Sequence, residues 1–237
     1  MMPVNLGFVY SSANSKYGYS PYYQWGRKDP LQRAPAGLTC YGERLFNTFG
    51  ADNDHSTDKT IENSIQNPNL FFLEYDNNQY YNWMAPVTVG NTTIGSAYNL
   101  WDTYRTTATT ENTNSVKSVY DPCPSGWKVP SGNAFKGFTT TGSNTSTASQ
   151  FNVIGSFSSG WTYKRYFGDT LGVFFPASGS RYHASGGLSL VSSYGYCWSS
   201  ASYSSAIAYC LYFYSGYVYP VLTNYRAGGF SVRPFLE

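Results

Sequence analysis

The chain has 237 residues, of which 12% are charged and 19% aromatic, with 23 glycines and a formal net charge of +2. This composition favours short strands joined by many turns over long solvated helices, and the length allows a single large domain. Without a run of Lys or Arg, the chain lacks the electrostatic footprint that nucleic-acid binding needs and offers nothing to an anionic membrane surface. We therefore expect no nucleic-acid partner and no membrane insertion.

The N-terminal residues MMPVNLGFVYSSANSK contain no basic flank followed by a long apolar run, so they predict neither a signal peptide nor a membrane anchor. The four cysteines, Cys40, Cys123, Cys197 and Cys210, are too scattered to staple a domain of this size, and no CxxC pair suggests zinc. Cys197 and Cys210 flank a possible return between two strands. A disulfide between them and two free thiols are both open.

The first regular element in the sequence is the stretch TIENSIQNP, which predicts a short helix. It offers a polar start at Thr60, apolar Ile61 and Ile65 four residues apart, and Pro68 as a stop. The polar, Thr- and Asn-rich span from 77 to 119 then predicts an elaborated insertion. We expect Trp83 and Trp101 to anchor its irregular backbone.

The stretch DPCPSGWKVPSGNAFKGF, residues 121 to 138, predicts a turn, a short strand at WKV and a helix capped by Ser131 that carries Ala134 and Phe135. From residue 140 onward, short apolar runs separated by Gly and Ser predict strands. These runs are LGVFFPA, YCWSSA, YCLYFYS, GYVYP and FSVRPFL.

Tyrosine is concentrated near the C-terminus, because residues 194 to 225 hold nine of the 24 tyrosines. Alternation along a strand would turn Leu211 and Phe213 toward a core and Cys210, Tyr212 and Tyr214 away from it. Tyrosine gives a large, rigid contact and a hydroxyl at low entropic cost, as in antibody loops, so we expect an exposed binding face. The alternative is a set of cross-strand ladders that only stiffen the sheet.

The separation of core-facing from outward-facing side chains divides the C-terminal segment into a frame and a binding face. The predicted frame is Trp198, Ala208, Tyr209, Leu211, Phe213, Val218 and Pro220. The predicted ligand-binding residues are Tyr203, Ser204, Ser205, Cys210, Tyr212, Tyr214, Tyr217, Tyr219, Val221, Leu222, Asn224 and Tyr225. Arg226 and Arg233 are expected to lock the ends of this segment by hydrogen bonds.

Three blocks of the sequence resemble a known family. YYQWGRKDP, VYDPCPSGWKVPSGNAF, and CWSSASYSSAIAYCLYF followed by YRAGGFSVRP resemble the Fibrobacter-paralogous-domain family of Bacteroidetes surface proteins and fimbrillin-like adhesins. The last block also resembles the variable region of diversity-generating retroelement targets, in which a C-type lectin fold displays a mutated C-terminal segment. There, randomised template adenines cannot turn an Asn codon into Lys, Glu, Gln, Met or Trp, and residues 199 to 225 contain none of these.

Catalytic and metal-binding motifs are missing from the sequence. The two histidines, His55 and His183, lie in no recognisable motif, and no G-x-S-x-G elbow, phosphate-binding loop or H-E-x-x-H pattern is present. The acidic loop from 50 to 58 lacks the order of a calcium loop and is interpreted as a surface turn. We expect no catalytic residue, no metal and no cofactor.

The sequence and the resemblance together predict an α+β protein with a C-type lectin-like fold, made of short strands, two or more short helices and long loops. It would be one domain over residues 1–237, with the insertion at about 77–119 and a variable ligand-binding segment at about 178–237. The expected function is that of an adhesin or receptor-binding module with a protein or glycan ligand on another cell surface. The expected location is the cell surface, the extracellular space or a phage virion, and the oligomeric state is open. The alternatives are a structural fimbrial subunit and a hydrolase.

Overall fold

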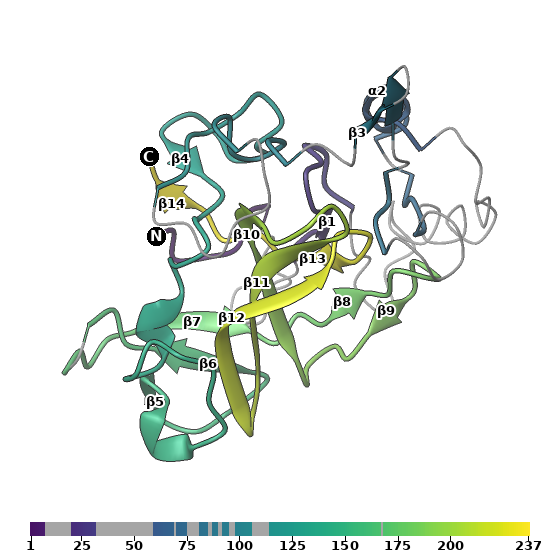
Figure 1. The fold of residues 1–237 in the computed structure, drawn as a ribbon. Helices are drawn as coiled ribbons and strands as arrows, with labels where there is room; N and C mark the ends of the chain where they lie inside the picture. The colour runs from purple at the N-terminus through teal and green to yellow at the C-terminus, as the bar shows by residue number, and fades with distance from the viewer. Residues whose placement is uncertain are drawn as a thin grey trace.

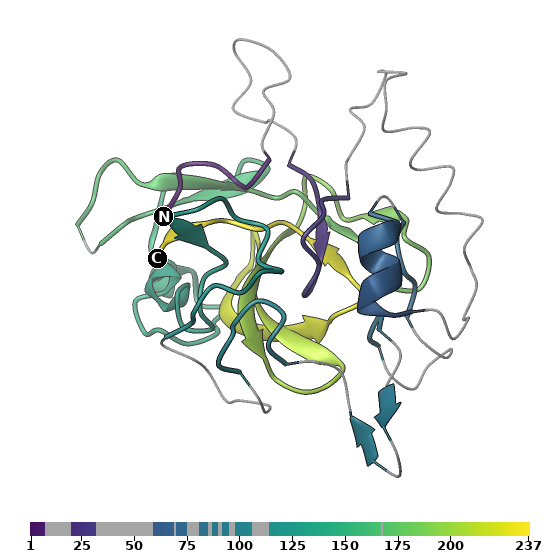
Figure 2. The same cartoon turned by 90° about the horizontal axis from the view of Figure 1, so that it is seen from above.

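The computed structural model describes residues 1–7, 20–31, 59–68, 70–74, 81–84, 87–89, 92–94, 98–105, 114–166 and 168–237. Within these residues the strands form five small antiparallel sheets, and the longest strands cross the middle of the molecule (Figure 1). The two ends of the chain lie side by side (Figure 2). Backbone hydrogen bonds from Met2 to Pro234 and from Leu6 to Val232, of 2.9 and 2.8 Å, hold them there.

The central sheet consists of three strands in the order β10-β11-β12. They are β10 (Gly195–Ser202), β11 (Ile207–Tyr214) and β12 (Tyr217–Tyr225). Alternating apolar and β-favouring aromatic residues explain these strands, and the Ser215–Gly216 turn joins β11 to β12.

Shorter strands surround this sheet. One sheet has the order β1-β13-β8-β9, made of β1 (Tyr23–Gln24), β13 (Gly229–Phe230), β8 (Ser180–Arg181) and β9 (Leu188–Ser189). Another contains β5 (Val153–Ile154), β6 (Gly160–Tyr163) and β7 (Val173–Pro176). Two pairs complete the set: β4 (Trp127–Lys128) with β14 (Phe235–Leu236), and β2 (Val87–Val89) with β3 (Thr92–Ile94).

A bulge in β12 changes which residues share a face of the central sheet. Tyr212 pairs with Tyr219 but Cys210 pairs with Leu222, so β12 has one extra residue in this interval. The side chain of Asn144 fixes the bulge, because its amide accepts from the Val221 N–H and donates to the Val221 carbonyl, each at 3.1 Å. The alternation of faces along Tyr217, Val218 and Tyr219 therefore ends at Pro220.

The two faces of the central sheet cover two different hydrophobic clusters. Cys197, Leu211, Phe213 and Val218 face a cluster with the β5–β7 sheet, which includes Phe175. The opposite face contributes to a second cluster with the N-terminal and insertion segments. The sheet residues there are Tyr196, Trp198, Ala208 and Cys210, and the covering residues include Tyr23, Trp25, Phe72, Trp83 and Trp101.

Tryptophans anchor the irregular backbone in these clusters. The indole N–H of Trp198 donates to the Tyr23 carbonyl at 2.8 Å, and that of Trp25 to the Ser199 carbonyl at 2.9 Å. Trp83 donates in turn to the carbonyl of Trp25 at 2.8 Å. These bonds join the N-terminal segment, the insertion and the central sheet, since a buried indole N–H needs a partner. Trp101 is also fully buried, so the expected anchoring by Trp83 and Trp101 is confirmed.

The helix α2 (Ile61–Gln66) lies where the sequence predicts it. The Thr60 hydroxyl accepts from the Asn63 N–H at 3.0 Å and caps its first turn. At the other end the buried Arg27 guanidinium donates to the carbonyls of Ser64, Asn67 and Pro68 at 3.2 to 3.3 Å. A cation at a helix C-terminus is favoured by the helix dipole, so Arg27 ties α2 to the segment after β1.

The expected α+β, C-type lectin-like fold is wrong. The described residues contain α2 and two 3₁₀ turns, η1 (Lys136–Phe138) and η2 (Ala148–Gln150), and are otherwise mostly β. The helix predicted from Ser131 is replaced by consecutive turns that end in η1. Gly132 and Gly137 interrupt that stretch, and glycine in a helix interior costs about 1 kcal/mol relative to alanine.

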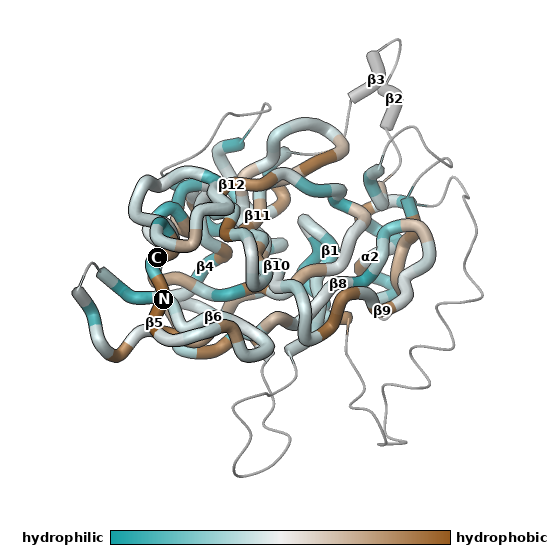
Figure 3. Tube along the Cα trace, turned by 90° about the horizontal axis from the view of Figure 1, so that it is seen from below, coloured by the Kyte–Doolittle hydropathy of each residue, from teal (hydrophilic) through white to brown (hydrophobic). Residues whose placement is uncertain are grey.

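The distribution of hydropathy agrees with this architecture. Brown, apolar segments are short and alternate with pale or teal ones along the trace (Figure 3). In the part of the chain that the structure describes, every helix is too short or too polar to span a lipid bilayer.

Candidate functional site

Five tyrosine rings meet at the end of the central sheet near the β11–β12 turn. Going round the group, the ring centroids are separated by 5.7 Å (Tyr194–Tyr212), 5.7 Å (Tyr212–Tyr219), 5.2 Å (Tyr219–Tyr217), 4.8 Å (Tyr217–Tyr214) and 4.9 Å (Tyr214–Tyr194). Each ring thus contacts at least two others in a closed circuit, and a further contact of 6.2 Å joins Tyr212 and Tyr214 across it. We call this group the tyrosine cluster.

Strand pairing explains why the rings meet. Tyr212 lies directly opposite Tyr219, and Tyr214 opposite Tyr217, so each pair projects from the same face of the sheet. All five side chains are partly exposed, whereas Tyr196, which contacts Tyr212 at 5.1 Å, is buried against Phe230. The cluster therefore rests on a buried aromatic layer and presents its outer side to water.

The cluster is electrically neutral. Residues 184 to 225 contain no Asp, Glu, Lys, Arg or His. Partial burial, followed by the neighbouring tyrosines, raises the pKa of Tyr212 above its ordinary value. Partial burial also raises the pKa of Tyr214, together with its hydrogen bond to Tyr217. The hydroxyls of Tyr212 and Tyr214 stay protonated at neutral pH and can both donate and accept hydrogen bonds.

The burial of the predicted frame agrees with the sequence. All seven frame residues are buried, and Trp198, Ala208, Leu211, Phe213 and Val218 are fully inaccessible. Of the twelve predicted ligand-binding residues, eleven are at least partly exposed. Exposure is a requirement for contact with a ligand, and whether they bind one stays a prediction.

Cys210 is the exception among the predicted ligand-binding residues. Only 1% of it is accessible, since it pairs with Trp198 and faces the cluster that the N-terminal segment covers. Placing Cys210 on the exposed face was therefore wrong. It shares a face with Tyr212, but that face is covered at Cys210 and open at the tyrosine cluster.

Cys197 and Cys210 are both free thiols. Cys197 pairs with Leu211 and Cys210 with Trp198, so the two side chains point to opposite faces of the sheet. A disulfide needs the two Cβ atoms to point toward each other, and this register prevents it. Of the two open possibilities, the structure has the free thiols.

The remaining predicted residues lie outside the tyrosine cluster. Tyr203 is 46% exposed in the β10–β11 connection, near Ser205. The Ser204 hydroxyl accepts from the Ala206 and Ile207 N–H groups, so it shapes that connection. The others are Val221, in the bulge, and Leu222 and Asn224, on β12.

The two arginines at the ends of the segment have different roles. The fully buried Arg226 donates to the Ser202 hydroxyl and, at 2.7 Å, to the Ser204 carbonyl, so it fixes the β10–β11 connection. Arg233 donates to the Asn5 side chain at 2.7 Å and the Phe174 carbonyl at 2.8 Å. It thus ties the C-terminal strand region to the N-terminus and to β7.

Tyr225 belongs to a separate aromatic group. Its ring stacks on that of Tyr81 at 3.9 Å, and it meets the His183 ring edge-on at 4.8 Å. Burial, followed by the neighbouring Tyr81, raises the pKa of Tyr225. Sequence reasoning missed Tyr81 and Tyr194. A Tyr-x-Tyr pattern with Tyr196 could have indicated Tyr194, but Tyr81 has no local signal because its partner is far along the chain.

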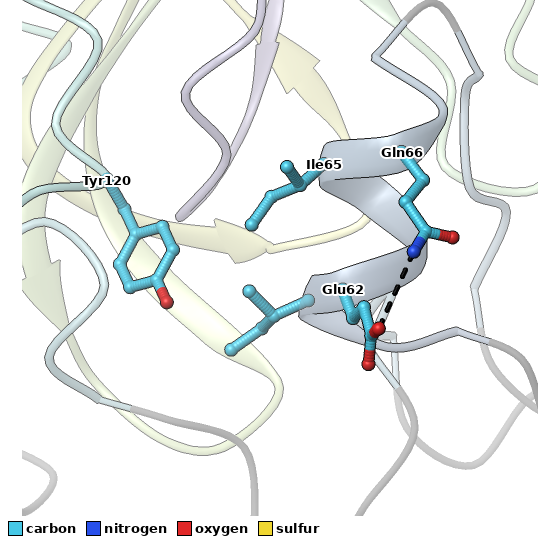
Figure 4. A pocket seen from close by; sticks show the side chains of 5 residues that line it. Glu62, Ile65, Gln66 and Tyr120 are labelled. Atoms are coloured by element: carbon cyan, nitrogen blue, oxygen red, sulfur yellow. Dashed lines mark hydrogen bonds between the residues drawn. The ribbon is translucent and has the colours of Figure 1, made fainter.

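Among the described residues there is no group of three or more His, Cys, Asp or Glu that could hold a metal ion. His55 and the acidic loop from 50 to 58 lie outside the described residues. An open hollow of about 410 Å³ lies between α2 and Tyr120, lined also by Ile61, Ile65 and Gln66 (Figure 4). Its lining is mostly apolar, with the Gln66 amide and the Glu62 carboxylate as its polar groups besides the Tyr120 hydroxyl.

Comparison with known proteins gives one match. Residues 163–235 match a family described as a domain of unknown function (DUF8237). This segment runs from the end of β6 to β14 and includes the whole tyrosine cluster. No curated protein and no solved structure matches the chain.

Proposed function

We propose that this protein is a ligand-binding adhesin or receptor-binding module that uses the tyrosine cluster as its contact surface. The observation that supports this most is the closed circuit of five partly exposed rings on a buried aromatic layer. Large rigid aromatic side chains with polar tips dominate the energetics of recognition surfaces. No bond is made or broken in this function.

The lack of charged residues between 184 and 225, the segment that carries the cluster, favours an uncharged ligand. Binding would depend on ring contacts and on hydrogen bonds from phenol hydroxyls, so the partner is an uncharged protein or glycan surface. Exposed charge pairs are screened by salt, whereas contacts of this kind are not. We expect affinity to stay constant between low and high ionic strength. The ligand would lie on another cell surface, which places the protein at a cell surface, in the extracellular space or on a phage virion.

A binding experiment with matched tyrosine variants tests this function. Fluorescently labelled protein is added to a panel of bacterial and host cells, and bound protein is measured by flow cytometry. The double variant Tyr217→Ala, Tyr219→Ala should reduce binding by about tenfold or more, because each central ring contributes about 1–2 kcal/mol. Tyr104→Ala and Tyr166→Ala are the controls, since these tyrosines are 78% and 63% exposed outside the cluster.

The controls decide how the outcome is interpreted. Equal loss in the Tyr104 and Tyr166 variants would mean that tyrosines bind cells without a specific site. Full binding by the double variant would remove the tyrosine cluster from the function. Circular dichroism of each variant checks that its fold is intact.

We further propose that a retroelement diversifies the exposed positions of this segment. The proposal is supported by the burial of every frame residue and by the lack of Lys, Glu, Gln, Met and Trp between residues 199 and 225. The resemblance to retroelement targets supports it as well. The test is the DNA beside the gene, where a near-copy of the 3′ end that differs at adenines should accompany a reverse transcriptase. Differences spread equally over frame codons would contradict diversification.

A structural subunit is the second candidate function. The direct cross-strand pairs Tyr212–Tyr219 and Tyr214–Tyr217 favour it, because such ladders also stiffen a sheet. In that case the cluster would pack against another subunit of the same assembly. Analytical ultracentrifugation separates the two, since a subunit should self-associate through the tyrosines and the double variant should stay monomeric.

A further inference from the structure

His183 lies in a tightly bonded turn, away from the residues of the tyrosine cluster. The turn joins β8 to β9, and the Tyr182 N–H donates to the Gly187 carbonyl while the Gly186 N–H donates to the Tyr182 carbonyl, both at 2.8 Å. Arg181, fully buried, donates to the Gly186 carbonyl at 2.6 Å. These bonds hold the backbone of the turn and therefore fix the backbone position from which the His183 side chain projects.

Glu74 orients the imidazole from another segment. Nδ1 of His183 lies 2.7 Å from Oε2 of Glu74, and the Glu74 N–H donates to the His183 carbonyl at 3.2 Å. The two side chains are 14% and 5% exposed. With Nδ1 engaged, the ring orientation is set, and Nε2 has no hydrogen-bond partner among the residues that the structure describes.

Three tyrosine rings surround the imidazole. The centroid distances from His183 are 4.4 Å to Tyr182, 4.8 Å to Tyr225 and 6.0 Å to Tyr81. Tyr182 is 50% exposed, so one wall of this group is open to water. We call His183, Glu74, Tyr81, Tyr182 and Tyr225 the His183 site.

The backbone of Tyr81 is strained where it enters this site. Its φ is 44°, in the left-handed region that side chains other than glycine rarely adopt. The Tyr81 carbonyl accepts from the Ala227 N–H at 3.1 Å, and its ring stacks on Tyr225. Such strain costs about 1–3 kcal/mol and persists where the surroundings enforce it, which occurs often at ligand sites. The site is thus built from four separate parts of the chain, at residues 74, 81, 182–183 and 225.

The chemistry of the site selects among ligand classes. An anion would meet the carboxylate of Glu74, and a cation would find the centre of the aromatic group already occupied by the imidazole. A hydroxyl can donate to a neutral Nε2 or accept from a protonated one, so it matches either state of His183. A sugar carries such hydroxyls beside apolar C–H faces that pack on aromatic rings.

We propose that the His183 site binds an uncharged sugar residue, with a hydroxyl on Nε2 of His183 and a ring face against Tyr182 and Tyr225. This site is distinct from the tyrosine cluster, so it stands whether or not the cluster binds a cell-surface ligand. Tyr225 then serves the sugar site and is not part of the tyrosine cluster.

The test uses methyl glycosides and short oligosaccharides of glucose, galactose, mannose and N-acetylglucosamine. Each is titrated into ¹⁵N-labelled protein while the imidazole signals are followed by NMR. The chain has only two histidines, so His183→Gln and His55→Gln assign the signals and His55→Gln is the matched control. We expect at least one sugar to shift the His183 signal and His183→Gln to weaken its binding by about tenfold, the worth of one well-made hydrogen bond.

Each outcome decides the proposal. A sugar that binds with the His183 signal unmoved would overturn it, as would a panel in which no sugar binds. The proposal would also be overturned if His183→Gln and His55→Gln weakened sugar binding equally. If the double variant Tyr217→Ala, Tyr219→Ala loses cell binding but keeps the sugar-induced shift of the His183 signal, the sugar site is separate from the tyrosine cluster. The NMR shift on the unaltered chain decides the matter even where a variant fails to fold.

Discussion

One face of the central sheet has two ends with opposite environments. At Trp198 and Cys210 the face is covered by the N-terminal segment and the insertion, and both side chains are buried. At Tyr214 and Tyr217, on the same face, the rings are partly exposed. Strand alternation decides which face a side chain belongs to, but the segments packed on that face decide whether it becomes core or surface.

The covered end should carry most of the stability. Trp198 is fully buried, stacks on Phe230 at 4.2 Å and donates to the Tyr23 carbonyl. Trp198→Ala should lower the free energy of unfolding by about 3–5 kcal/mol, since it leaves a cavity and an unpaired carbonyl. Urea denaturation measures this, with Tyr217→Ala as the control at the open end. Equal effects of the two variants would contradict the comparison.

Cys210 tests the contrast between the two ends, because the sequence predicts it to be exposed and the structure buries it at the covered end. Cys210→Ser should lower the free energy of unfolding by about 1–3 kcal/mol, since it buries a hydroxyl among apolar groups. It should leave cell binding by the folded protein unchanged. A thiol reagent should label Cys210 only after denaturant is added. Rapid labelling of this thiol in the native protein would place it at the surface after all.

Alkaline pH should weaken the covered parts of the sheet before it affects the cluster. Burial raises the pKa of Cys197 from 9.0 to about 12, so the unfolded chain releases this proton first. The stabilisation is therefore complete below pH 9 and is lost as pH rises toward 12. We expect Cys197 to contribute about 1 kcal/mol to the fall in the free energy of unfolding between pH 9 and pH 10. Cys197→Ala should flatten this slope in urea titrations, and an unchanged slope would assign the loss to other groups.

Local sequence patterns were enough to predict α2, the strand at Trp127, four of the five C-terminal strand regions and the buried frame. These features depend only on residues within one turn of the chain or on alternation along one strand. The fifth region, residues 230–236, is strand only near its two ends. The fold class was wrong because the helix expected at Ser131 gave way to turns at two glycines. Cys210 was misplaced because its cover comes from residues more than a hundred positions away, such as Trp25 and Trp83.

The tyrosine cluster was predictable in part. Tyr212, Tyr214, Tyr217 and Tyr219 follow from alternation around a two-residue turn, which fixes their cross-strand pairs. The face of the sheet to which Tyr225 belongs was not predictable, because it follows from the bulge that Asn144 holds at Val221. That contact joins positions 77 residues apart, and no local pattern records it.

The smallest effect should come from the hydroxyl of a single cluster tyrosine. Tyr219→Phe keeps the ring contacts with Tyr212 and Tyr217 at 5.7 and 5.2 Å and removes one partly exposed hydroxyl. Because that hydroxyl is partly exposed to water in the folded protein, its removal should change the free energy of unfolding by less than about 0.5 kcal/mol. If the same variant weakens cell binding several-fold, the hydroxyl acts on the ligand and not on the fold. A stability loss as large as that of Cys210→Ser would instead show that the open end of the sheet is part of the core, and the contrast between its two ends would be lost.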